Sequence, residues 1–148
     1  MRVLVQRSKN SSVKIDNRIN GKIEHGYVLL VGFTNGDTKD VIDKIVKKIL
    51  NLRIFEDENG KMNKSIIDVK GEILSISQFT LYASLKGGNR PSFTESLNYE
   101  EASNLYDYFN SKLRENNIKV KTGIFGSDME VSILNNGPVT IMIDSKDI

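Results

Sequence analysis

The run from residue 26 to residue 33 constrains the fold more than any other stretch of this sequence. It reads Gly-Tyr-Val-Leu-Leu-Val-Gly-Phe and contains no charged side chain. A run this short and this apolar is typical of a β-strand that is covered on both faces. We therefore expect a central strand of a sheet, with other parts of the chain packed against both of its surfaces.

Other segments with alternating or aliphatic residues predict further strands around this one. Residues 20–21 (Asn-Gly) could instead form a hairpin turn, and residues 24–26 (Glu-His-Gly) indicate a turn before the central strand. Residues 135–138 should interrupt the last two strands. The strands that we expect are residues 3–6, 12–15, 18–24, 71–76, 118–121, 129–134 and 139–143.

Two segments have the apolar spacing of amphipathic helices. The first begins at Asp37 or Thr38, either of which can cap it, and the second has Asn98 as its N-cap with an acidic residue at the third helical position. Strands and helices arranged in this order predict one α/β domain, residues 1–148, with helices on one side of the sheets. The apolar faces comprise Val41, Ile42, Ile45, Val46, Ile49 and Leu50 in the first helix, and Ala102, Leu105, Tyr106, Phe109 and Leu113 in the second.

The composition excludes several kinds of catalytic site. The chain has no cysteine, so disulfides, thiolate zinc sites and a cysteine nucleophile are all absent. His25 is the single histidine, and we expect it in a solvated turn rather than as a general base. A metal site would have to be built from carboxylates alone. We therefore predict a mechanism that needs neither a metal nor a cofactor.

The charge balance neither demands nor excludes a nucleic-acid partner. Lysine and arginine total 21 against 19 acidic residues, which gives a net charge of +2. Basic clusters at residues 86–90 and 112–121 could contact a few phosphates, although such clusters also occur on ordinary solvated surfaces. No apolar run approaches the roughly 20 residues that cross a bilayer, and no signal peptide is evident. These features predict a cytoplasmic protein with no membrane partner.

Polar side chains gather where the apolar segment 71–76 ends. Ser77, Gln78 and Thr80 lie within four positions of one another, beside Phe79. The end of a strand, where the chain opens into a loop, is a common place for reactive groups. The same cluster could simply cap and close the strand. The glycine- and proline-containing loop 85–93 follows, and a loop of this length in a compact domain is often functional.

Two motifs occur together in this chain, Ser77-Gln78-Phe79-Thr80-Leu81 and Asn136-Gly137-Pro138-Val139-Thr140. The pair resembles the two signature motifs of the D-aminoacyl-tRNA deacylases, and the likeness extends through residues 5–7, 60–63, 89–93 and 122–126. Asn136 is a small departure, because many members carry Asp there. The Gly137-Pro138 pair is intact.

The resemblance implies a three-layer α/β domain, with two β-sheets and two main helices on one side, that forms a homodimer with active sites at the subunit interface. It implies hydrolysis of the ester that joins a D-amino acid to the 3′ end of tRNA, and of glycine mischarged on tRNA(Ala). L-aminoacyl-tRNA would be rejected by Gly137-Pro138, which in the family is cis and reaches into the partner's site. No metal or cofactor is implied.

The resemblance also suggests roles for individual residues. The ester should lie near Ser77, Gln78, Phe79 and Thr80, with the backbone N–H groups of Phe79 and Thr80 as oxyanion donors. Thr80 could attack as a nucleophile, or the ribose 2′-hydroxyl of the tRNA could activate water; the scarcity of acid–base groups favours the second route.

Three further residues are implicated around the substrate. By analogy with the family, Phe125 and Met129 line an adenosine pocket, unless they serve only the core. Arg7 could meet a phosphate or help to hold the site. The alternatives to an enzyme are a non-catalytic tRNA-binding or synthetase-associated module of the same fold, and a dimeric structural protein without a tRNA role.

Overall fold

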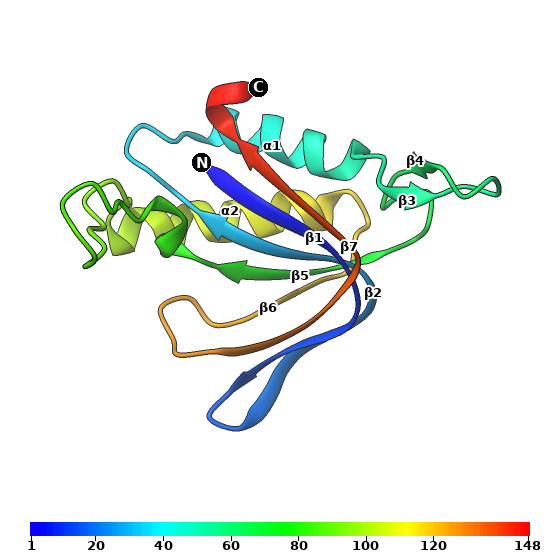
Figure 1. Cartoon of the computed structure of the whole chain (residues 1–148), viewed down its shortest axis with the longest axis horizontal. Helices are drawn as coiled ribbons and strands as arrows, with labels where there is room; N and C mark the ends of the chain where they lie inside the picture. The colour runs from blue at the N-terminus through cyan, green and yellow to red at the C-terminus, as the bar shows by residue number, and fades with distance from the viewer.

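The computed structural model describes residues 1–148, which form two sheets and two main helices (Figure 1). Five strands form one sheet in the order β6-β5-β2-β1-β7, in which β5 is parallel to both β2 and β6 and the other pairs are antiparallel. Strands β3 and β4 form a small separate hairpin. The elements are β1 (Arg2–Ile15), β2 (Arg18–Gly32), α1 (Lys39–Asn51), β3 (Phe55–Glu56), β4 (Met62–Lys64), β5 (Glu72–Ser77), η1 (Phe79–Tyr82), α2 (Tyr99–Glu115), β6 (Val120–Thr122), β7 (Glu130–Asp144) and η2 (Ser145–Asp147).

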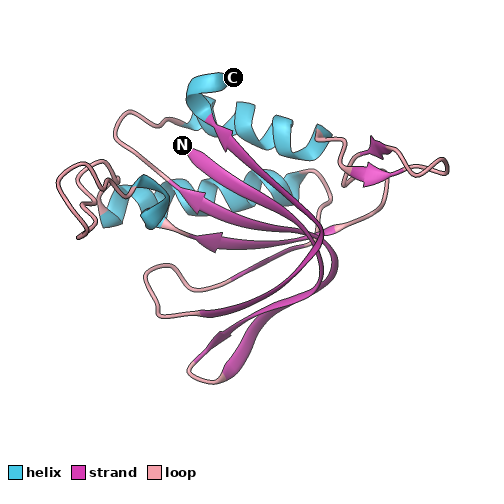
Figure 2. Ribbon diagram, in the orientation of Figure 1, coloured by secondary structure: helices cyan, strands magenta, loops and turns pink.

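The long strands β1, β2 and β7 curve sharply, so that the sheet folds back beneath itself while both main helices lie on its other side (Figure 2). A large apolar cluster lies between the helices and the upper half of the sheet, and includes Leu29 and Ile45. A smaller one, which includes Val13 and Leu74, lies between the two halves of the sheet. The result is the expected three-layer α/β arrangement.

The apolar run at residues 26–33 takes the central place that we predicted. It belongs to β2, which lies between β5 and β1. Tyr27 and Leu29 are fully buried in the large cluster, and Val28 is fully buried in the small one. Side chains on successive residues of a strand point to opposite faces, so a strand in the middle layer needs apolar residues on both.

The predicted helix starts are confirmed by their capping contacts. Thr38 caps α1, with its hydroxyl accepting from the Val41 N–H at 3.4 Å. Asn98 caps α2, with its side-chain oxygen accepting from the Glu101 N–H at 3.0 Å. Each helix turns its apolar face to the core, which stabilises it far more than propensity alone. Neither helix has the length and apolar character of a membrane span.

The turn predicted at residues 24–26 is wrong, and the alternative hairpin turn at residues 20–21 does not form, because the continuous strand β2 runs through both. The interruption expected at residues 135–138 occurs only in the pairing with β1, which leaves residues 136–139 without partners between Asn135 and Thr140, while β7 itself continues. Gly26 serves close packing rather than a turn: a Cβ there would lie 1.9 Å from the carbonyl oxygen of Glu72 on β5. His25 is therefore an exposed strand residue, with Nε2 3.0 Å from the carbonyl oxygen of Val69. The short strands β3 and β4 were not among the strands expected from the sequence.

Candidate functional site

A cavity of about 670 Å³ opens where β5 ends. It is enclosed by the end of β2, the start of η1, the first turn of α2 and the loop 123–129. Its wall is mainly apolar, with a few hydroxyl, amide and carboxylate groups among the apolar side chains, as small-molecule sites usually have. The lining residues are Val31, Gly32, Phe33, Ile76, Ser77, Gln78, Phe79, Leu97, Tyr99, Ala102, Phe125, Gly126, Ser127, Asp128, Met129 and Val131.

The chain leaves β5 at the edge of this cavity. Ile76 is buried in the small core cluster, whereas Ser77 and Gln78 are half-buried. The Gln78 N–H still donates to the Val31 carbonyl oxygen at 2.7 Å, which ties the exit to β2. Gly32 allows this close passage, because a Cβ there would lie 2.8 Å from the Gln78 carbonyl oxygen.

Phe79 and Thr80 begin the 3₁₀ turn η1. The first N–H groups of a helical turn have no acceptor within that turn, so they are available to a ligand. The Phe79 side chain lines the cavity and is 55% exposed. Thr80 is exposed and does not line the cavity, and its hydroxyl accepts a hydrogen bond from the Gln78 side-chain amide. This arrangement places Phe79 at the edge of an apolar cavity, with two free backbone donors, those of Phe79 and Thr80, in succession along the chain.

Phe125 and Met129 lie between the cavity and the core. Both line the cavity, and each also packs against a core cluster. The Phe125 ring meets Tyr99 edge-on, with 5.1 Å between ring centroids, and lies 5.7 Å from the Tyr106 ring. Gly123 leaves room for Met129, since a Cβ there would be 2.3 Å from its sulfur.

Arg7 lies away from this cavity and holds the second motif. It is only 6% exposed, and its Nη1 donates to the Ile54 carbonyl oxygen at 2.7 Å. Its Nε donates to the Asn136 carbonyl oxygen at 3.2 Å, directly before Gly137. These contacts favour the holding role for Arg7 over contact with phosphate. A buried guanidinium needs such partners, because an unpaired buried charge is costly.

The Gly137-Pro138 bond is cis, and both residues are exposed on β7, the edge strand of the sheet. The Asn135 side chain holds the main chain on both sides of this motif. Its amide donates to the carbonyl oxygens of Arg7 at 3.0 Å and of Val139 at 3.1 Å. Neither Gly137 nor Pro138 lines the cavity of its own chain. The fold thus places the two sequence motifs in separate locations.

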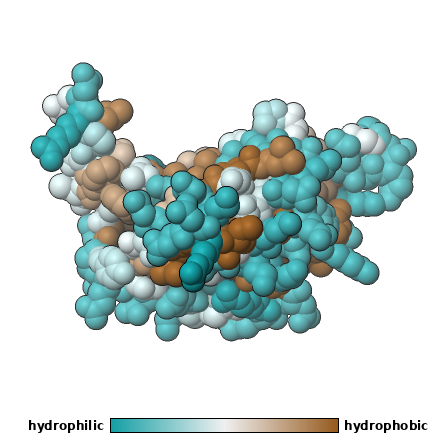
Figure 3. Space-filling view, turned by 90° about the horizontal axis from the view of Figure 1, so that it is seen from below, coloured by the Kyte–Doolittle hydropathy of each residue, from teal (hydrophilic) through white to brown (hydrophobic).

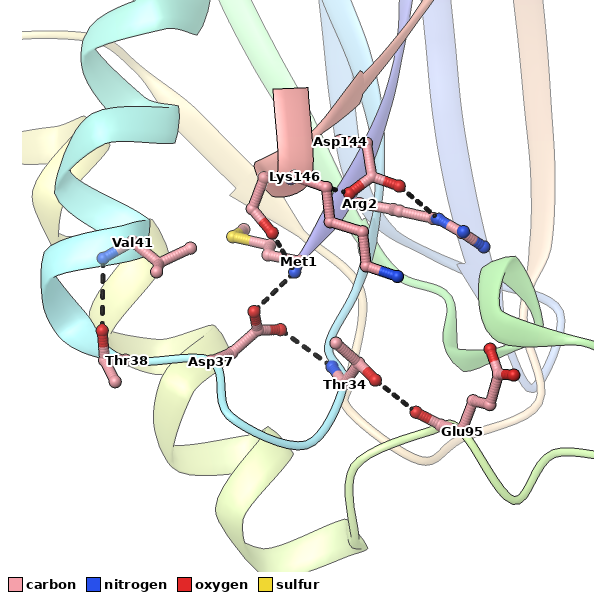
Figure 4. A network of polar contacts seen from close by, with 10 residues as sticks. Met1, Arg2, Thr34, Asp37, Thr38, Val41, Glu95, Asp144 and Lys146 are labelled. Carbon is pink, nitrogen blue, oxygen red and sulfur yellow. Dashed lines mark hydrogen bonds and ion pairs between the residues drawn. The ribbon is translucent and has the colours of Figure 1, made fainter. Parts of the chain in front are cut away.

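A polar network supports η1 on the side of β1 (Figure 4). Arg2 donates from Nε to Asp144 at 2.8 Å and from Nη1 to the Leu81 carbonyl oxygen at 2.9 Å. Its guanidinium lies 4.6 Å from the centre of the Tyr82 ring. Partial burial acts to raise the pKa of Asp144. The hydrogen bonds from Arg2 and the Lys146 amide, together with the Arg2 charge, outweigh that effect and lower this pKa.

The same network reaches the loops that precede both helices. The Met1 amino group lies 2.5 Å from an Asp37 carboxylate oxygen, and the other oxygen accepts from the Thr34 N–H at 2.8 Å (Figure 4). The Thr34 hydroxyl donates to the Glu95 carbonyl oxygen at 2.6 Å. These contacts connect the loop before α1 to the chain that leads into α2.

The chain is closely similar to known proteins over nearly its whole length. A family model described as D-Tyr-tRNA(Tyr) deacylase matches residues 4–144. The D-aminoacyl-tRNA deacylase of Clostridium tetani (strain Massachusetts / E88) is 57% identical over 148 residues, covering 100% of this chain and 99% of its own. That of Aquifex aeolicus (strain VF5) is 53% identical over 148 residues and covers 100% of both chains.

The chain belongs to the D-aminoacyl-tRNA deacylase family. The family resemblance inferred from the sequence is thereby confirmed, together with the assignment to a family of hydrolases.

Solved structures agree with the fold of this deacylase family member. One titled "c-Myc DNA Unwinding Element Binding Protein" has a TM-score of 0.92 and 40% identity, covering 97% of this chain and 98% of its own. Another, titled "Structural Analysis of a probable eukaryotic D-amino acid tRNA deacylase", has a TM-score of 0.81 and 18% identity, with coverage of 96% and 97%. The second supports the fold alone.

Sequence reasoning missed three residues with polar groups that line this cavity. Tyr99, Ser127 and Asp128 line it, but none stood out in the sequence. Tyr99 directly follows Asn98, the N-cap of α2, and the capping pattern indicates a helix start but no role for Tyr99 itself. Asp128 lies in a segment with no helical or strand periodicity. Only the packing of α2 beside the loop 123–129 brings them together, so no local signal could have identified them.

Proposed function

We propose that this chain hydrolyses the ester that joins a D-amino acid to the terminal adenosine of tRNA and spares the L-aminoacyl ester. The observation that carries the proposal is the cavity at the end of β5, which Phe79 lines at the start of η1, with Thr80 next to it in the chain. A largely apolar cavity with a few fixed donors suits an aminoacylated nucleoside. The work of such an enzyme would be cytoplasmic, where aminoacyl-tRNA is used.

Ester hydrolysis develops negative charge on the carbonyl oxygen, and backbone donors can stabilise it. The N–H groups of Phe79 and Thr80 would form the oxyanion hole, a contribution of about 3–4 kcal/mol per donor in other hydrolases. The hydrogen bond from the backbone N–H of Gln78 to the Val31 carbonyl oxygen, at 2.7 Å, keeps this turn in a fixed position relative to β2. Ser77 and Gln78 would orient the ester between β5 and η1.

Water rather than a protein nucleophile would attack the ester, with the ribose 2′-hydroxyl of the tRNA orienting or activating it. Thr80 is the competing nucleophile, but its hydroxyl is engaged by the Gln78 amide. The single histidine, His25, contacts Val69 and does not line the cavity. A hydroxyl nucleophile needs an adjacent base, and the cavity offers Thr80 no imidazole.

A homodimer would complete the site, with Gly137-Pro138 of one protomer forming a wall in the cavity of its partner. The motif is exposed on the edge strand β7 and does not line the cavity of its own chain. Exposed edge strands readily pair with another chain unless they are protected. Leu134 and Met142, also on β7, are 55% and 48% exposed, which is consistent with a face that a second subunit covers.

Main-chain carbonyls at this wall would occupy the space that an L side chain needs. Arg7 and Asn135 hold the main chain around the motif through the carbonyl oxygens of Asn136 and Val139, so it resists displacement. Rejection by steric exclusion cannot act on glycine, which has no side chain. The enzyme would therefore also hydrolyse glycine mischarged on tRNA(Ala).

The adenine would lie beside Phe125 and Met129, where Phe125 can stack on the base. Tyr99 supports Phe125 edge-on at 5.1 Å between ring centroids and would set its angle. The same ring pair forms part of the cavity wall.

The decisive experiment incubates the protein with matched D- and L-aminoacyl-tRNA and follows release of the amino acid. Release of the D-amino acid at a rate at least 100-fold above the L-amino acid is the expected result. Equal rates would overturn chiral selection. Binding of tRNA without turnover of either ester would indicate a non-catalytic tRNA-binding module instead.

A further inference from the structure

The loop of residues 85–93, between η1 and α2, stands away from the body of the molecule at the left edge of Figures 1 and 3. An antiparallel bridge closes its base, where the N–H of each of Ser84 and Ser92 donates to the carbonyl oxygen of the other at 2.9 Å. Added Cβ atoms on Gly87 and Gly88 would meet nothing within 4 Å. The loop thus presents an open surface on a fixed base.

The end of this loop lies directly beside Phe79, one of the proposed oxyanion donors. The Phe93 ring meets the Phe79 ring edge-on, with 4.9 Å between centroids. The Ser96 hydroxyl donates to the Phe79 carbonyl oxygen at 3.1 Å. Phe93 is 37% exposed and Leu85 is 64% exposed, so apolar surface continues outward from the rim of the cavity.

The loop carries two cations that have no anionic partner. Lys86 and Arg90 are exposed, and their side chains form no salt bridge or hydrogen bond within the chain, although Lys64, Lys112 and Lys119 each pair with a glutamate. No aspartate or glutamate lies between residues 84 and 94. Free cations beside exposed apolar and aromatic groups are the combination that binds single-stranded nucleic acid.

We propose that the 85–93 loop binds the unpaired 3′ end of the tRNA, with Lys86 and Arg90 contacting the phosphates that precede the terminal adenosine. The inference rests on the proposed function, because it assumes that the terminal adenosine enters the cavity beside Phe79. The nucleotides that precede the adenosine must then leave past the rim, where the loop stands. The exposed Phe93 ring offers a surface to an unpaired base.

Substrates with and without phosphates separate this role from catalysis. The variant Lys86→Ala/Arg90→Ala is assayed on D-aminoacyl-tRNA and on the D-aminoacyl ester of adenosine, which carries no phosphate. On the tRNA we expect KM to rise about tenfold at low salt while kcat is unchanged. Each lost single-strand phosphate contact should lower the slope of log(kcat/KM) against log salt by about 0.7. On the adenosine ester both constants should equal those of the wild type.

A matched control removes the same charge elsewhere. The variant Lys44→Ala/Lys47→Ala alters two exposed lysines on the outer face of α1 and should leave the tRNA kinetics at wild-type values. Equal losses in the control and the loop variant would overturn the proposal, because they would indicate general charge attraction. Unchanged tRNA kinetics in the loop variant, or an equal loss on both substrates, would also overturn it.

A binding measurement distinguishes failure of this inference from failure of the proposed function. Uncharged tRNA is titrated in its intact form and after removal of its unpaired 3′ nucleotides. Wild-type protein should bind the intact form at least fivefold more tightly, and the loop variant should lose that difference. Equal binding of the two forms by the wild type, or a difference retained by the loop variant, would overturn the inference whether or not any ester is hydrolysed. Absence of turnover on both substrates would count against the proposed function alone.

Discussion

Arg7 donates from Nε to the carbonyl oxygen of Asn136 at 3.2 Å, so a buried cation on β1 holds the main chain immediately before Gly137-Pro138. The same guanidinium binds the Ile54 carbonyl oxygen at 2.7 Å, which connects the motif to the chain beyond α1. A side chain with several donors in a rigid plane can serve two carbonyls at once, whereas a lysine would lose that geometry.

Replacing this cation should weaken both stability and chiral selection. In Arg7→Met, the carbonyl oxygens of Ile54 and Asn136 lose their donor, and the buried Ile54 oxygen alone costs roughly 1–3 kcal/mol. We expect a lower unfolding temperature and at least a tenfold smaller ratio of D to L hydrolysis rates. Arg7→Lys should lie between Met and the wild type. A Met variant with wild-type stability and selectivity would contradict the holding role.

Gly137 tolerates no side chain. A Cβ there would lie 2.8 Å from Val139 Cγ2 and 3.0 Å from Arg7 Nη2, at a backbone φ of +117°. We expect Gly137→Ala to lose roughly 1–3 kcal/mol of unfolding free energy, the usual cost of a side chain in a strained backbone region. Urea unfolding measures it. Gly87→Ala is the matched control, because it has open space and should unfold like the wild type.

Thr80 should prove dispensable for the chemical step. Its hydroxyl accepts from the Gln78 amide and does not line the cavity, so Thr80→Ala should retain at least a third of the wild-type kcat. Replacing the terminal ribose of the tRNA by 2′-deoxyribose should instead lower kcat at least 100-fold. Single-turnover rates on both substrates test this. The reverse pattern would establish Thr80 as the nucleophile.

The Arg2–Asp144 pair predicts a specific pH dependence of stability. Because the pKa of Asp144 is lowered in the folded state, this carboxylate stabilises the fold above its unfolded pKa of about 3.9. That stabilisation is lost as the pH falls through the lower, folded pKa. The difference in unfolding free energy between the wild type and Asp144→Asn should be constant from pH 7 to 5 and shrink below about pH 4. A difference independent of pH would show that the pair contributes no such linkage.

A charge on the exposed face of β7 should separate the proposed dimer. Leu134 is 55% exposed on this edge strand, and Leu134→Arg should yield a monomer in analytical ultracentrifugation with little activity on D-aminoacyl-tRNA. Ile67 provides the control, because it is 48% exposed and lies near the C-terminal end of α1, away from β7. Ile67→Arg should keep the wild-type oligomeric state. A wild-type protein that sediments as a monomer would refute the shared site.

The local patterns of the sequence located both helices and most strand segments, but not the continuity and curvature of the long strands or the β3-β4 hairpin. Apolar spacing located both helices and their caps at Thr38 and Asn98, because these are determined within a few residues. Gly26 was misread because a glycine required by the close approach of another strand looks the same in sequence as one in a turn. Long-range packing therefore decides what a glycine means.

The candidate site likewise contains residues that local sequence patterns identify and residues that only long-range contacts identify. The motif residues Ser77 to Thr80 were found because polar groups at the end of an apolar strand stand out locally. The partners of Arg7, which are main-chain carbonyls of Ile54 and Asn136, have no sequence signature at all. Tyr99 was missed because its role depends on a ring from another segment, Phe125.

Strands β1, β2 and β7 each pass through both halves of the bent sheet. Cleaving the chain at any one position therefore cannot separate the two halves of the sheet while keeping the strand pairing of either half intact. Insertions and deletions over evolution should be confined to the periphery, such as the β3-β4 hairpin, while the long strands keep their length.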